Sequence, residues 1–178
     1  MIKIKGYEVR SLTSELLLKE FEYISELLND KEKLHFEKWS DIFVYLGIPE
    51  EVVDEFDTID FIEAIKEFNI MNEQSNVIIK SFEIDNITYT SFEDVFRLSV
   101  KEMSLIEGYV KKNGNRYLGE IMAVIYKIGN DKVINYDKSH IHHKAELFRK
   151  NIKADVAIPF INFLSSRFIK EVEMLDED

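Results

Sequence analysis

The 178-residue sequence predicts an α+β fold that is predominantly α-helical. Apolar residues alternate around a short polar turn twice in the chain, and elsewhere they recur at the spacing of helical faces. The order of a hairpin followed by helices also repeats, at an offset of about 80 residues. We therefore expect two short β-hairpins, each followed by helices, and a helical pair near the C-terminal end.

The first hairpin is expected over the first nine residues. Apolar residues alternate from Ile2 to Val9 around Lys5-Gly6, and such alternation around a glycine-containing turn is typical of a hairpin. Ser11 or Thr13 is then expected to cap a helix that has Glu15 in its first turn and ends near Asn29-Asp30.

Three further helices are expected in the first half. One runs from about Leu34 to Leu46, Gly47 suits its C-terminus, and Pro49 to Glu51 suit the first turn of the next helix. Asp57 or Thr58 opens the last of them. Its apolar positions on or near one side are Ile59, Ile62, Ile65, Phe68 and Ile70.

A polar stretch, Met71 to Asn76, is the best internal boundary and predicts lobes at 1–70 and 77–178. Each lobe alone holds only ~75–100 residues, near the size at which an isolated core gives little stability. We therefore expect one compact body with two lobes.

The second half repeats the pattern of the first. Phe82 to Tyr89 alternate around Asp85-Asn86, and Ser91 with Asp94 resembles a capping box before apolar positions that continue to Val110. A strongly apolar helix is predicted from Tyr117 to Ile128.

Two short segments align between the halves. Ile4 to Tyr7 matches Ile84 to Ile87, and Asp41 to Val44 matches Glu120 to Ala123. We interpret this as a pseudo-duplication of a hairpin-plus-helices unit, with chance similarity of two helical stretches as the alternative. The C-terminal pair follows, one helix leading to Asn151-Ile152-Lys153 and another capped by Ala154-Asp155.

Composition and charge exclude several classes of protein. The net charge is −11, and the densest basic stretch, Lys144 to Lys153, is interrupted by Glu146, whereas nucleic-acid binding requires a basic face. The chain has no cysteine and no apolar run of the ~20 residues that span a bilayer. We expect a soluble intracellular protein that binds neither nucleic acid nor membrane.

The most distinctive candidate for chemistry is a histidine cluster. On a helix, Asp137, His140 and His143 share a face that suits a divalent metal, with His142 beside them. The alternative is that Ser139 caps the helix and the histidines are solvated. A metal-dependent enzyme using this cluster is therefore a minor hypothesis.

A second group of acids lies in Glu50 to Asp57. Glu51 with Asp54 or Glu55 would suit Mg²⁺, but the apolar residues between them favour an acidic surface helix. Motifs of nucleophilic, zinc and P-loop enzymes are absent from the sequence. We expect no enzyme activity and no cofactor.

Broad apolar stripes suggest protein binding instead. Two helix faces are wide for a small domain and are expected to be partly exposed, with a cofactor site as the lesser alternative. The candidate interaction residues are Trp39, Phe43, Leu46, Ile158, Ile161 and Phe163.

Several runs resemble proteins of tailed bacteriophages. Tyr7 to Thr13 before a helix, and Trp39 to Glu51 with its Leu-Gly-Ile-Pro-Glu-Glu end, resemble tail assembly chaperones. Lys144 to Arg149 and Val156 to Phe163 are similar to C-terminal parts of related phage morphogenesis proteins.

This resemblance implies a non-enzymatic assembly factor that binds the tape measure or tail tube proteins in the host cytoplasm. A structural component of the virion, in the neck, tail or capsid interior, is the alternative, and a homo-oligomer is compatible with both.

Overall fold

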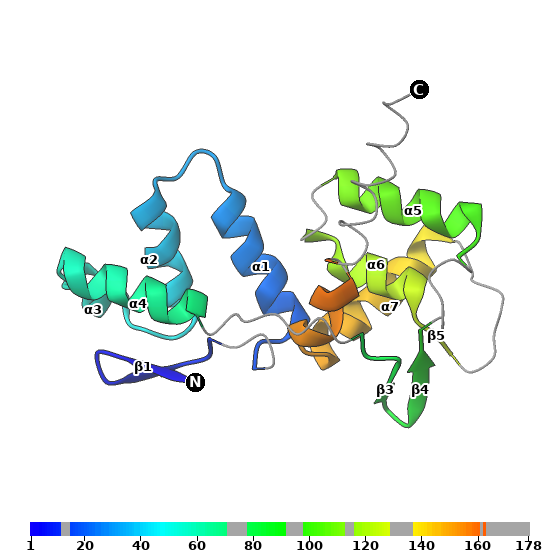
Figure 1. Ribbon diagram of the computed structural model, residues 1–178, viewed down its shortest axis with the longest axis horizontal. Helices are drawn as coiled ribbons and strands as arrows, with labels where there is room; N and C mark the ends of the chain where they lie inside the picture. Colours follow the sequence, from blue (N-terminus) through cyan, green and yellow to red (C-terminus); the bar gives the residue numbers. More distant parts are fainter. Residues whose placement is uncertain are drawn as a thin grey trace.

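The computed structural model describes residues 1–11, 15–70, 78–91, 98–112, 116–128, 137–160 and 162. Helices predominate in these ranges, and the strands form two small antiparallel sheets (Figure 1). The predicted class, α+β with mostly α-helix, is confirmed.

The first hairpin is formed as predicted. β1 (Ile2–Ile4) pairs with β2 (Tyr7–Val9), and Ile4 faces Tyr7 in the register. Both turn residues have positive φ, 49° at Lys5 and 88° at Gly6, as a two-residue type I′ turn requires.

The first helix begins later than the sequence suggested. α1 spans Leu18–Asn29, and Ser11 is buried upstream of it rather than capping it; Thr13 lies outside the described residues. Leu17, immediately before α1, is extended and forms an antiparallel bridge with the distant Lys153. The Leu18 N–H donates to the Ile152 carbonyl at 2.9 Å, and the Ala154 N–H donates to the Leu16 carbonyl at 3.0 Å.

The next helices match the predicted order. They are α2 (His35–Tyr45), α3 (Glu50–Asp54) and α4 (Thr58–Ile70). Gly47, at φ 103°, ends the α2 turn, and the Asp57 carboxylate caps α4 by accepting from the Asp60 N–H at 2.8 Å.

The buried face of α4 differs from the predicted one. Ile59 is 70% exposed and Ile62 38% exposed, whereas Phe61 and Ala64 are buried with Ile65 and Phe68. The helix is therefore rotated relative to the expected stripe, because the aromatic ring of Phe61 packs inward against other rings.

The second hairpin is also confirmed. β3 (Ser81–Ile84) pairs with β4 (Ile87–Thr90), and Asp85 and Asn86 have φ values of 52° and 62°. A third strand, β5 (Lys127–Ile128), pairs with β4.

The expected helix from Tyr117 to Ile128 is therefore too long. α6 spans Leu118–Ile125, and the backbone is extended at Tyr126 so that the next two residues join the sheet.

The helix before it, α5, spans Val100–Lys111 and is capped by Ser99, whose hydroxyl accepts from the Glu102 N–H at 3.3 Å. Ser91 instead donates its hydroxyl to the Lys80 carbonyl at 3.2 Å. The rest of the capping box proposed for Ser91 and Asp94 lies outside the described residues, so it stays a prediction.

The C-terminal helical pair is present as far as the structure describes it. α7 spans Lys138–Asn151, and residues 154–160 and 162 are helical. Within the described ranges, no helix is both long and apolar enough to cross a bilayer.

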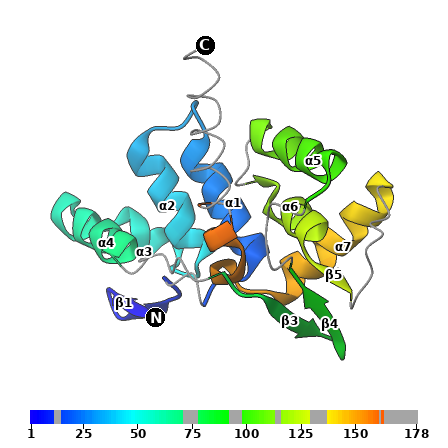
Figure 2. The ribbon, with the colours of Figure 1, turned by 45° about the vertical axis from the view of Figure 1, so that its right-hand side comes forward.

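Two clusters of buried side chains fill the molecule. The first core includes Trp39, Ile42 and Phe43, and the second includes Ile121, Met122 and Phe148. α1 lies between the two cores and contributes to both, with Ile24 in the first core and Leu18 in the second (Figure 2).

The predicted boundary at 71–76 lies outside the described residues, so the lobe limits stay a prediction.

Candidate functional site

A surface hollow lies between α2, α3 and the start of α4. These three helices are on the left of Figure 1. We call the hollow the α2–α3 groove, and its volume is about 390 Å³. Its lining residues are Phe36, Glu37, Ser40, Asp41, Val53, Asp54, Phe56, Thr58 and Phe61.

Aromatic rings form the apolar part of the groove. Phe61 is buried, with its ring 5.4 Å from that of Phe36, 6.1 Å from that of Phe56 and 5.5 Å from that of Phe43. Phe36 is 48% exposed. The groove therefore presents a large ring to solvent while its base is continuous with the first core.

Local sequence explains this arrangement. Gly47 permits the sharp turn after α2, and α3 is only five residues long, so Val53 and Phe56 return to the side of α2. The first hairpin supports the same region, since Lys5 pairs with Asp60 and its Nζ lies 5.9 Å from the centre of the Phe56 ring.

Carboxylates surround the aromatic rings. Glu37 and Asp54 are exposed at the groove, and Asp41 pairs with Lys33 at 2.5 Å. Residues 1–70 hold 17 Asp and Glu against 8 Lys and Arg, a net charge of −9 out of −11 for the chain. The groove is thus on the strongly acidic half.

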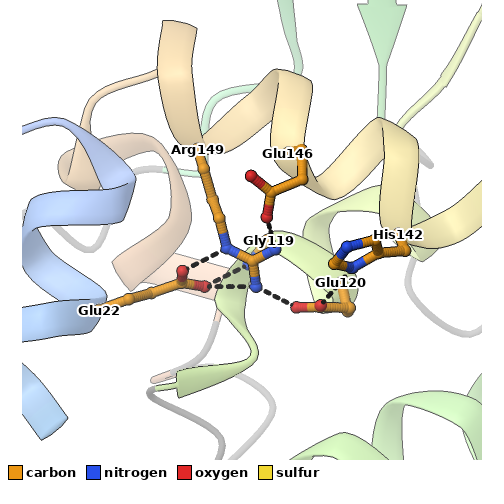
Figure 3. Close-up of polar contacts among 6 residues, drawn as sticks. All are labelled: Glu22, Gly119, Glu120, His142, Glu146 and Arg149. Atoms are coloured by element: carbon orange, nitrogen blue, oxygen red, sulfur yellow. Dashed lines mark hydrogen bonds and ion pairs between the residues drawn. The ribbon is translucent and has the colours of Figure 1, made fainter.

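A buried ion-pair cluster lies where α1, α6 and α7 meet (Figure 3). Arg149 of α7 donates from Nε to Glu22 of α1 at 2.5 Å and pairs with Glu120 of α6. It also donates to Glu146 at 2.8 Å. The Gly119 N–H donates to Glu22 at 2.8 Å.

Burial strengthens the interactions in this cluster. Burial raises the pKa of Glu22, and this effect exceeds the lowering that the hydrogen bond and charge of Arg149 cause. Burial also disfavours the charged form of Arg149, but the hydrogen bonds to Glu22 and Glu120 outweigh it and leave the pKa of the guanidinium raised. The pairs span up to 127 residues of sequence, so the cluster joins the two halves of the chain and is a structural device.

The predicted interaction residues are mostly in the cores. Trp39 is 3% exposed, Phe43 0%, Leu46 7% and Ile158 5%, which corrects the expectation of partly exposed stripes. These side chains face inward because facing helices cover them. Ile161 and Phe163 lie outside the described residues.

The histidine cluster does not form a metal site in the described part of the chain. His140, His142 and His143 are exposed, and Asp137 is the cap of α7, accepting from the Ser139 N–H and hydroxyl. These hydrogen bonds lower the pKa of Asp137. No group of three or more His, Asp or Glu residues able to hold a metal occurs among the residues described, so Glu51, Asp54 and Glu55 are not such a group either.

The groove residues Phe36 and Phe61 were missed because the exposure of one and the burial of the other depend on which helices pack beside them. One signal was available, since the acidic excess of residues 1–70 can be counted from the sequence. The ion-pair cluster had no local signal, because its partners lie on three separate helices.

In comparisons with known proteins, no protein family, curated protein or solved structure matches this chain.

Proposed function

We propose that the protein is a non-enzymatic assembly factor that binds tail proteins of a bacteriophage, either the tape measure or the tail tube protein. The α2–α3 groove is the observation that carries this proposal. It combines exposed aromatic surface with a carboxylate rim, and apolar surface of this kind is typical of protein-binding sites.

The negative charge of the same half supports a role in keeping a bound partner soluble. A net charge of −9 on residues 1–70 keeps a protein soluble while apolar segments of a partner are covered. Binding uses the groove rather than the faces of Trp39 and Phe43, since those side chains are buried.

The phage context rests on the resemblance to tail assembly chaperones. One of the runs that carry it, Leu46 to Glu51, contains the turn that joins α2 to α3. This run therefore connects the two helices that line the groove, although its own residues are not part of the lining.

Co-expression tests this function. The protein is produced together with tape measure and tail tube proteins of phages that share the Leu46 to Glu51 pattern, and the soluble fraction of each partner is measured. A partner that is insoluble alone is expected to become soluble with the wild-type chain. Failure across the whole set contradicts the proposal.

A virion component is the alternative function, and the two differ in where the protein is found. Mass spectrometry of purified particles is expected to find an assembly factor absent or well below the amount of the tail proteins. A stoichiometric amount would establish the virion component instead.

A further inference from the structure

We propose that the α2–α3 groove binds an amphipathic helix of the partner, with apolar anchor residues flanked by Lys or Arg. This inference rests on the proposed function, because it specifies the chemistry of the segment that such a factor would hold. Three properties of the groove lead to it: its aromatic base, its charge and the secondary structure of its walls.

The aromatic base provides the anchor site. Phe36 stands 48% exposed beside the buried Phe61, with their ring centres 5.4 Å apart. A hollow of about 390 Å³ is within the range of roughly 300–1,000 Å³ that ligand pockets occupy. It admits large apolar side chains, and fully desolvated apolar anchors supply most of the energy of an interface.

The charge selects the flanking residues. Residues 37–67 hold ten Asp and Glu against two Lys, and Lys5 and Lys33 pair with Asp60 and Asp41 of this range, so the region carries a net charge of −6. Glu37 and Asp54 are exposed at the groove itself. Lys and Arg next to the anchors would meet this field, which both accelerates association and disfavours acidic partners.

The walls favour a helix as the bound form. Phe36, Glu37 and Asp41 belong to α2, and Val53 and Asp54 belong to α3. Their backbone groups are used within or at the ends of helices, so the groove does not offer the open strand edge that an extended peptide needs. A groove between helices with an aromatic base instead suits an amphipathic helix with anchors at i, i+3 or i+4 and i+7.

A second copy of the chain is a poor occupant. A symmetric contact through this face would bring two acidic surfaces together, −6 against −6 over residues 37–67 with the paired Lys5 and Lys33 included. Like charges in direct opposition disfavour such an interface.

The probe for this site is a labelled peptide of about 18 residues with Leu at the anchor spacing and Lys and Ala elsewhere. Its control is an isomer of the same composition whose leucines are dispersed around the helix. Fluorescence anisotropy with the full chain is expected to give at least about tenfold tighter binding for the peptide with the apolar face.

Three variants locate the binding. Phe36→Ala and Asp54→Lys are each expected to weaken binding of the amphipathic peptide about tenfold. Glu83→Lys makes the same change of charge on the exposed face of β3 and is expected to change it by less than about twofold. Circular dichroism checks that all three variants keep the wild-type helix content and melting temperature.

Several results would overturn the inference. Equal binding of the two peptides, or equal weakening by Asp54→Lys and Glu83→Lys, would mean general charge attraction. Concentration-dependent dimerisation that Phe36→Ala abolishes would assign the groove to a second copy. If Phe36→Ala solubilises co-expressed tail proteins as well as the wild type does, the proposed function is kept and the groove is rejected as the binding site. If the peptide binds as expected but no tail protein is solubilised, the groove is kept as a helix-binding site and the proposed function is rejected.

Discussion

Gly119 shows how the absence of one side chain determines the geometry of the ion-pair cluster. A Cβ atom at this position would lie 3.0 Å from Arg149 Cζ, 3.1 Å from Arg149 Nε and 3.2 Å from the Ala145 carbonyl oxygen. The guanidinium therefore lies directly on the backbone of α6, where the Gly119 N–H also donates to Glu22.

We predict that Gly119→Ala destabilises the protein and that Gly108→Ala does the opposite. Alanine gains about 1 kcal/mol of helix propensity at either site, but overpacking against Arg149 costs about 1–3 kcal/mol at Gly119. A Cβ at Gly108, in α5, meets no atom within 4 Å in the described structure. Urea unfolding measures both variants, and a stabilising Gly119→Ala would contradict the packing argument.

At the residue scale, the sequence predicted turns better than contacts. Gly6, Gly47 and Asn86 were expected at turns because a positive φ favours glycine and asparagine, and each has one. The exposure of Phe36 and the burial of Trp39 depend on which neighbouring helices cover them, so helical spacing alone did not distinguish the two.

A lysine from another helix covers the C-terminal end of α6. Lys144 of α7 donates its Nζ protons to the Ala123 carbonyl at 2.9 Å and to the Tyr126 carbonyl. The same Nζ lies 5.9 Å from the ring centre of Tyr89 and 5.6 Å from that of Phe148. Burial, with the charge of Lys127, lowers the pKa of Lys144 to about 8.

This shift predicts a pH-dependent contribution to stability. Between pH 8 and 10.5 the unfolded chain holds the Lys144 proton more firmly than the folded one, so the contribution of this group to stability rises with pH in that interval. The free energy of unfolding of the wild type relative to Lys144→Met is expected to increase by about 1–3 kcal/mol from pH 7.5 to pH 10.

Urea unfolding at several pH values tests this prediction. Lys150→Met, an exposed position on the same helix, is the matched control and is expected to differ from the wild type by the same amount at every pH. A constant difference for Lys144→Met as well would show that Lys144 keeps an ordinary pKa.

At the element scale, both hairpins and most helix ends were predicted well, but the start of α1 and the end of α6 were not. Both hairpins depend on residues within a few positions of one another. The start of α1 depends instead on pairing with Ile152 and Ala154, and the end of α6 depends on pairing of β5 with β4. Local patterns do not contain these distant partners, so tertiary pairing overrode helix propensity.

For the whole molecule, the ion-pair cluster is the main polar connection between the halves. Glu22 and Glu120 are each 7% exposed, and both depend on Arg149 for their neutralising charge. A buried pair is costly to break because the remaining charge stays unpaired.

We predict that Arg149→Met lowers the free energy of unfolding by about 3–5 kcal/mol. Adding Glu22→Gln and Glu120→Gln is expected to restore most of this loss, since neutral amides no longer need a cation. Unfolding is followed by circular dichroism and by the fluorescence of Trp39, the single tryptophan, which reports on the first core. An equally unstable triple variant would show that the shape of Arg149 matters rather than its charge.

The repeated pattern predicted two hairpins that are each followed by helices, and the described residues contain both; the division into lobes and the duplication stay predictions. The use of α1 by both cores was not anticipated, because its apolar positions are equally consistent with one buried face. Leu18 joins the second core and Ile24 the first core. This difference follows from where the second half of the chain packs against α1.

The shared position of α1 has a consequence for synthesis on the ribosome. Arg149 is added 127 residues after Glu22, which takes roughly 6–25 seconds at ordinary translation rates. During that interval the nascent chain can close its first core around Trp39, while Leu18 and Glu22 still lack their partners. The packing of α1 into the second core therefore has to wait until α7 has been synthesised. If the α7 of a neighbouring nascent chain reached α1 first, the two chains would form a domain-swapped pair.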